Sequence, residues 1–155
     1  MTNRVAATMT LRGEQINGDR VCCTGNQLAA VLHALDAVLQ DEQWYAADIA
    51  VNQRFPWASL SSQNQAAHIG NIENLARFAT QIDQFLSGIF LAVPSYISPI
   101  WNRSFDTEDE PTHDLGDAIL EIRAFDTSYF ELYTSNPQIF DLLRASFEAA
   151  ETTVA

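Results

Sequence analysis

Residues 118–147 constrain the fold more than any other stretch, because two short-period segments are followed directly by a helical one. Apolar and charged residues alternate over residues 120–124, which is typical of a strand that buries one face. A second alternating segment covers residues 129–133, with Tyr129, Glu131 and Tyr133 on its outward, solvated side. Residues 126–128 are Asp, Thr and Ser, which suit a tight turn or bulge. We therefore expect two paired antiparallel strands.

A helix is predicted to follow these strands. Asn136 is a favourable N-cap residue, and Pro137 occupies the first helical position, where its missing N–H is not needed. The apolar residues then recur at helical spacing, at Ile139, Leu142, Leu143 and Phe147. The strand–strand–helix unit indicates a fold class but assigns no chemistry.

The rest of the chain also alternates between segments with strand periodicity and segments with helical periodicity. Thr24 and Gln27 form a capping-box pattern, and Gly88 is expected to end the second helix. In chain order we expect a strand at 4–12, a helix at 28–39, a strand at 43–51, a helix at 66–86 and a buried strand at 89–93. The order β–α–β–α–β–loop–β–β–α predicts one α+β domain over residues 1–155. About three helices would pack on a mostly antiparallel or mixed sheet.

Composition excludes several functions. The net charge is −12, and all eight basic residues are arginine, so chemistry that requires a lysine is excluded. An acidic protein is repelled by phosphate backbones, so we expect no nucleic-acid partner. The same charge favours encounter with basic proteins.

Cysteine usage and hydropathy bear on the compartment. Cys22 and Cys23 are adjacent, which suits two reduced thiols, one of them facing inward, better than a disulfide or a metal site. The N-terminus lacks the apolar run of a signal peptide, and the apolar run at 89–93 is too short to span a bilayer. These features predict a soluble cytoplasmic protein that does not bind membranes.

One long aperiodic segment covers residues 98–117, and we refer to it as the acidic loop. Loops of this length are usually functional or disordered. Six of its residues are acidic, equal to half of the net charge: Asp106, Glu108, Asp109, Glu110, Asp114 and Asp117. They are candidate contacts for a basic partner.

Two other interpretations of the acidic loop remain open. It could be a mobile, solvated segment. It could also hold a metal ion through Asp109, His113, Asp114 and Asp117, but their spacing matches neither a calcium-binding EF loop nor a zinc motif. We therefore expect no metal and no cofactor.

Aromatic residues flank the irregular segments and include Phe55, Trp57, Tyr96, Trp101 and Phe105. Trp57, Trp101 and the neighbouring Arg103 are candidate interface residues, because Trp, Tyr and Arg dominate binding hot spots. The alternative is that these rings form small satellite clusters of the core under two loops.

Catalysis finds little support in the sequence. The three histidines lie far apart, and no nucleophile elbow, zinc-protease or dinucleotide motif is present. We expect no catalytic residues, and the protein is not predicted to be an enzyme.

The C-terminal unit resembles part of a known group of proteins. The resemblance covers about a fifth of the chain and rests on Phe125, Asp126, Ser128, Tyr129, Leu132 and Tyr133, followed by Ile139, Leu142 and Leu143. This segment is similar to the C-terminal part of small bacterial proteins of unknown function, several of which look like immunity proteins of toxin systems. The resemblance implies a protein that binds and neutralises a basic bacterial toxin domain. Alternatives are a regulatory or phage-type inhibitor that mimics nucleic-acid charge, and a small enzyme; the oligomeric state stays open.

Overall fold

The computed structural model describes residues 2–54 and 56–154. The strands are β1 (Ala7–Leu11), β2 (Glu42–Val51), β3 (Ala67–Gly70), β4 (Phe85–Pro94), β5 (Leu120–Phe125), β6 (Tyr129–Thr134) and β7 (Glu151–Val154). The helices are α1 (Gly13–Ile16), α2 (Gly25–Leu35), α3 (Ile72–Ala79) and α4 (Pro137–Ser146), with a 3-10 turn η1 (Ala58–Ser61). The predicted α+β class is confirmed.

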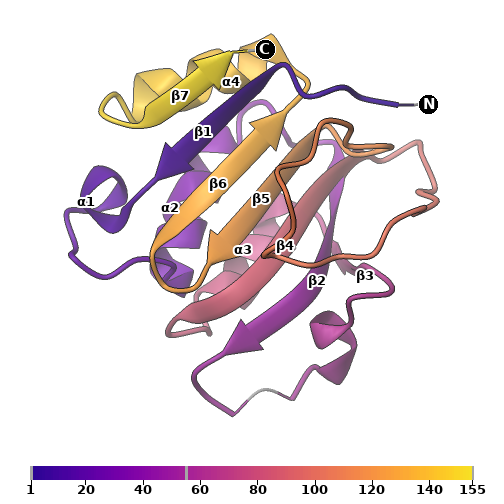
Figure 1. Cartoon of the computed structure of the whole chain (residues 1–155), viewed down its shortest axis with the longest axis horizontal. Helices are drawn as coiled ribbons and strands as arrows, with labels where there is room; N and C mark the ends of the chain where they lie inside the picture. The colour runs from indigo at the N-terminus through magenta and orange to yellow at the C-terminus, as the bar shows by residue number, and fades with distance from the viewer. Residues whose placement is uncertain (1, 55, 155) are drawn as a thin grey trace.

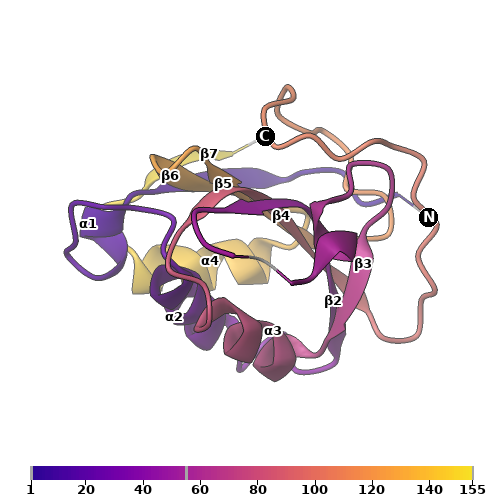
Figure 2. The same cartoon turned by 90° about the horizontal axis from the view of Figure 1, so that it is seen from below.

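All seven strands form one antiparallel sheet in the order β3-β2-β4-β5-β6-β1-β7. Helices α2, α3 and α4 cover one face of this sheet, while the acidic loop crosses the other face (Figures 1 and 2). The main core lies on the helix side. It contains Met9, Leu11, Leu28, Leu32, Leu75, Ile122, Leu132, Ile139 and Leu143. In the part of the chain that the structure describes, no helix is long and apolar enough to cross a membrane.

The predicted strand–strand–helix unit is confirmed as β5, β6 and α4. The turn between the strands places Asp126 and Thr127 at positive φ, 40° and 61°, which suits short polar side chains better than bulky apolar ones. The Asn136 side chain accepts a hydrogen bond from the backbone N–H of Gln138 at 2.8 Å, and Pro137 starts α4. The polar turn residues therefore set the boundary between β5 and β6, and the Asn136 cap sets the start of α4.

Replacing Asn136 with alanine should lower the free energy of unfolding by about 1 kcal/mol, because the Gln138 N–H loses its side-chain acceptor. Asn136→Ser should retain most of the stability, since serine also caps helices. Urea denaturation of the three proteins measures the difference. Equal midpoints for the wild type and Asn136→Ala would mean that this cap does not stabilise the folded state.

The predicted helix at 66–86 is wrong, and the predicted helix end at Gly88 is wrong with it. Residues 67–70 form β3, α3 spans only residues 72–79, and β4 begins at Phe85. Gly70 has a φ of 130°, which turns the chain out of β3. Asn71 and Asn74 then form a capping box that starts a new helix. Gly88 lies inside β4, where an added Cβ would come within 2.9 Å of the Ile49 side chain.

Two smaller predictions also differ from the structure, and one strand was missed. The first strand begins at Ala7, and Val5 packs on the opposite side of the sheet from the main core. Helix α2 ends at Leu35, before the end of the apolar stripe at 28–39. Strand β7 was not predicted, because its four side chains are all exposed and leave no apolar period to detect.

Both cysteines point into the protein, whereas only one was predicted to do so. Cys22 and Cys23 are buried free thiols. Cys23 has a φ of 64°, so the chain does not continue the extended alternation that would expose one side chain. The Cys23 thiol lies 3.2 Å from the carbonyl oxygen of Tyr129 on β6.

Candidate functional site

The acidic loop covers part of the sheet face that lies opposite the helices (Figure 2). Cross-strand pairing places Leu91, Glu121 and Tyr133 in one row of this face and Ile89, Arg123 and Glu131 in the next. Phe105 and Leu115 of the loop pack on the apolar residues of this face and form a second, smaller core. The loop thus buries the β4 and β5 side of the face (Figure 1).

The loop buries side chains that the alternating pattern predicted to be exposed. Glu121, Arg123 and Tyr133 were placed on faces directed away from the core, yet only 0%, 1% and 1% of their surfaces are exposed. The apolar alternation identified the helix side correctly, because Leu120, Ile122 and Ala124 belong to the main core. The charged side is buried because residues 98–117 fold over it.

A buried ion network lies beneath the loop. Arg123 Nε donates to Glu121 Oε2 at 2.7 Å, and Arg103 Nη1 donates to Glu121 Oε1 at 2.6 Å. Arg123 Nη1 also donates to the backbone carbonyl of Asp109 at 3.0 Å. A buried charge is costly unless it is paired and hydrogen-bonded, so these bonds tie the loop to the sheet.

A second anchor is Asp48, which interrupts the regular register of β2. Its φ is 54°, and the β2–β4 register shifts between Ala47 and Ala50. One carboxylate oxygen of Asp48 accepts hydrogen bonds from the backbone N–H and the hydroxyl of Thr107, both at 2.8 Å. The bulge therefore aims a strand side chain at the loop backbone.

The N-terminal segment supplies a third attachment. The backbone N–H of Asn3 donates to the Gly116 carbonyl at 3.0 Å, and the N–H of Leu115 donates to the Asn3 carbonyl at 2.8 Å. Val5 N–H donates to the His113 carbonyl at 3.0 Å. The loop is thus held near both ends and in its middle, which favours an ordered loop over the mobile alternative.

Three of the six predicted acidic residues accept hydrogen bonds from backbone N–H groups of the loop: Asp106 and Asp114 close local turns, and Asp117 links the two ends of the loop. The side chain of Asp106 accepts from Glu108 N–H at 3.0 Å, and that of Asp114 accepts from Gly116 N–H at 2.8 Å. Asp117 accepts from Ile100 N–H at 3.0 Å. These carboxylates help to shape the loop, as Asx-type turns do.

The other three acidic residues, Glu108, Asp109 and Glu110, form what we call the acidic triad. All three are exposed. Among the described residues the ion pairs are Arg77–Glu73, Arg103–Glu121 and Arg123–Glu121, and none of them involves the triad. Arg103 and Arg123 both pair with Glu121 instead. Among the described residues, no ion pair neutralises the negative charge of the triad.

The predicted aromatic anchors separate in space. Trp101 is half-buried and packs edge-on against Tyr45 and Phe105, with ring centroids 5.7 and 5.6 Å apart. Trp57 is 39% exposed and packs against Phe78, in a different surface hollow from Trp101. Phe55, also predicted to belong to this group, lies outside the described residues. Trp101 therefore belongs to the loop region, whereas Trp57 does not.

Arg103 has an internal role in the structure. Besides its bond to Glu121, its guanidinium lies over the Phe105 ring, 4.7 Å from the centroid. Tyr96 and Ile100 are far more exposed, at 83% and 75%, and flank the same segment. The sequence offered no reason to prefer Tyr96 and Ile100 over Trp101 as candidate interface residues.

The residues proposed for a metal site do not converge. Within residues 2–54 and 56–154, no group of three or more His, Cys, Asp or Glu side chains is arranged to hold a metal ion. Asp109, His113, Asp114 and Asp117 follow one another along the extended loop instead.

The β6 side of the loop carries a tyrosine and a carboxylate in direct contact. The hydroxyl of Tyr133 donates to the carboxylate of Glu131. Burial is the main cause that raises the pKa of Tyr133, and the hydrogen bond to Glu131 raises this pKa further. The phenol therefore stays neutral and keeps the Glu131 carboxylate oriented.

Comparison with protein-family models, curated proteins and solved structures finds no match for this chain.

Proposed function

We propose that this protein is a non-enzymatic binding protein that neutralises a basic protein domain by direct contact, in the manner that its resemblance to immunity-like proteins implies. The observation that carries this proposal is the acidic triad. Three carboxylates are exposed without cationic partners. They are displayed on a loop whose backbone is anchored by Arg123, Asp48 and the N-terminal segment.

Anchoring matters because binding by a mobile segment costs conformational entropy. A loop that is already in place loses less freedom when a partner docks, so more of the interaction free energy appears as affinity. The net charge of −12 adds a long-range attraction for a basic surface. Together these features suit fast and specific association with a cationic protein.

The proposal makes the partner recognisable by its chemistry. It should carry a patch of arginine or lysine, and its harmful activity should cease when the complex forms. A toxin domain that acts on nucleic acid fits this description well, because its own substrate requires a basic surface. Binding of an acidic protein would then block substrate access.

The experiment is affinity capture from the native cell at low salt, followed by an activity assay of the captured protein. We expect a basic protein at 1:1 stoichiometry whose activity is lost in the complex. Capture should fail for a variant with Glu108→Gln, Asp109→Asn and Glu110→Gln. It should persist for a control with Asp36→Asn, Asp141→Asn and Glu148→Gln, which has the same net charge. A partner that stays fully active in the complex would contradict neutralisation.

A further inference from the structure

Part of the sheet face opposite the helices is left open beside the acidic loop. Strands β1 and β7 have no covering segment on this side, and the end of β6 that carries Tyr129 and Glu131 is partly exposed, whereas Tyr133 lies under the loop (Figure 1). Thr10 pairs with Glu131 on one side and Glu151 on the other, so these three side chains form one row across the open face. Thr8 pairs in the same way with Tyr133 and Thr153. The open face is therefore polar, with acidic residues but few apolar ones.

A recess of about 520 Å³ lies where the open face meets the loop. The acidic triad forms one wall, and Phe125, Tyr129 and Glu131 of the β5–β6 hairpin form the other. The lining residues include no arginine, although Arg12 lies over the Tyr129 ring and Arg123 is buried behind the wall, where it bonds the Asp109 carbonyl. The recess therefore combines four carboxylates with aromatic rings, and it connects the triad to the open face.

The aromatic wall suits a planar cation. The Phe125 and Tyr129 rings stack with centroids 5.1 Å apart and an interplanar angle of 26°. The guanidinium of Arg12 already lies over the Tyr129 ring, 5.2 Å from its centroid. The protein itself thus shows that this ring accepts a guanidinium. Carboxylates beside an aromatic face are the usual surroundings of a bound arginine side chain.

A larger hollow of about 590 Å³ beside Trp101 is less suited to a cation. It is lined by Arg103 as well as by Asp114 and Asp117, and by the apolar side chains of Ile97 and Ile100. Its charge is mixed. Charge complementarity to a basic surface therefore favours the recess next to β6.

We propose that the open face of β6, β1 and β7, together with this recess, is the docking surface for a basic protein, and that one arginine of that protein enters the recess. This inference rests on the proposed function for the basic character of the partner. It goes further in naming the surface and the side chain. The guanidinium of the partner would take the place of Arg12 over the Tyr129 ring and pair with carboxylates of Glu131 and the triad.

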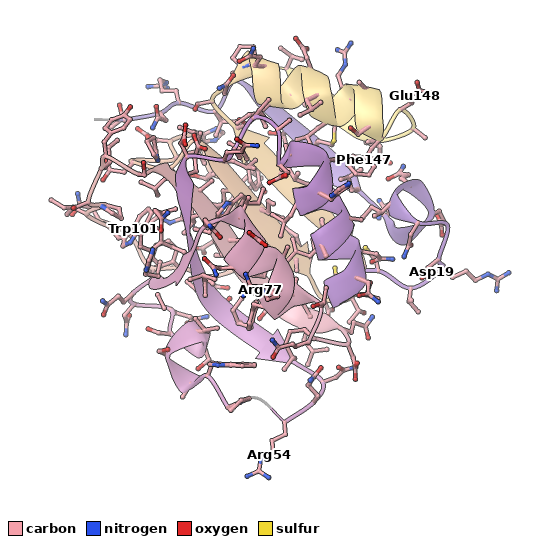
Figure 3. The ribbon with its side chains drawn as sticks, turned by 180° about the vertical axis from the view of Figure 1, so that it is seen from behind. Asp19, Arg54, Arg77, Trp101, Phe147 and Glu148 are labelled. Carbon is pink, nitrogen blue, oxygen red and sulfur yellow. The ribbon has the colours of Figure 1, made fainter. Side chains whose placement is uncertain are left out.

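The first test uses a hexa-arginine amide peptide as the probe, with binding measured by calorimetry at low salt. Glu131→Gln should weaken binding about tenfold, because it removes a carboxylate from the recess. Tyr129→Leu should weaken it by a similar factor, whereas Tyr129→Phe should stay within about twofold of the wild type. Glu148→Gln is the matched control, since Glu148 follows α4 on the helix side, far from Trp101 and the loop (Figure 3).

Two outcomes would overturn the docking surface. One is equal weakening by Glu131→Gln and Glu148→Gln, which would indicate diffuse charge attraction. The other is unchanged binding in Glu131→Gln, a variant that retains the shape of the side chain and tests the recess even if Tyr129→Leu unfolds. Hexa-lysine should bind more weakly than hexa-arginine, and equal affinities would contradict the arginine assignment.

The captured native partner separates this inference from the proposed function. If the wild type captures and neutralises a basic protein, and Glu131→Gln and Tyr129→Leu do so equally well, the docking surface is wrong while the proposed function stands. If the wild type captures no basic protein, the proposed function fails, and peptide binding cannot rescue it.

Discussion

Replacing Glu121 with alanine is expected to lower the free energy of unfolding by about 3–5 kcal/mol. Glu121 is fully buried and accepts hydrogen bonds from both Arg103 and Arg123. Without it, the buried guanidinium of Arg123 has no counter-charge. An uncompensated buried charge costs far more than the intact pair contributes.

Urea denaturation measures this loss, and a double variant tests its cause. Glu121→Leu combined with Arg123→Met removes both buried charges and should recover much of the stability lost in Glu121→Ala. The double variant should still loosen the loop, because Arg123 no longer binds the Asp109 carbonyl. A double variant as unstable as the sum of its single changes would refute the charge explanation.

Replacing Ile122 with alanine should cost about 2–5 kcal/mol, since the side chain is completely buried in the main core. Leu142 belongs to the apolar stripe that the sequence predicts for α4, which would place it in the core as well. In the structure Leu142 is only partly buried at the edge of that core, so Leu142→Ala should cost clearly less. Leu143, one position later, is buried and should resemble Ile122.

Thermal and urea unfolding of Ile122→Ala, Leu142→Ala and Leu143→Ala give the ranking directly. We expect Ile122 and Leu143 to be far more sensitive than Leu142. Equal losses at Leu142 and Leu143 would mean that α4 is rotated relative to the sheet from its position in the structure.

The C-terminal half of the fold was predictable because its signals are local. A polar turn at residues 126–128 and the cap at Asn136 act on their immediate neighbours, whatever the rest of the chain does. The region around Gly70 was misread because its strand exists only through pairing with β2. An apolar pattern that continues from β3 into α3 and β4 cannot reveal such a pairing.

The acidic loop was predictable as a long irregular segment, but the roles of its residues within the fold were not. The acidic loop was recognisable from charge alone, yet the sequence could not separate Asp106, Asp114 and Asp117, whose side chains bond the loop backbone, from the exposed triad. Burial of Glu121 and Arg123 depends on a segment that folds over them from elsewhere in the chain. Asp48 offered one usable signal, an acidic residue inside an otherwise apolar stretch of β2.

The association rate of the captured partner, measured over about 20–300 mM salt, tests the central claim most directly. The wild type should associate fastest at low salt and slow steeply as salt rises. The variant neutralised at Glu108, Asp109 and Glu110 should associate about tenfold more slowly at low salt, with a shallower salt dependence. The control neutralised at Asp36, Asp141 and Glu148 should stay close to the wild type. Identical rates and slopes for the wild type and the triad variant would contradict recognition by the acidic loop.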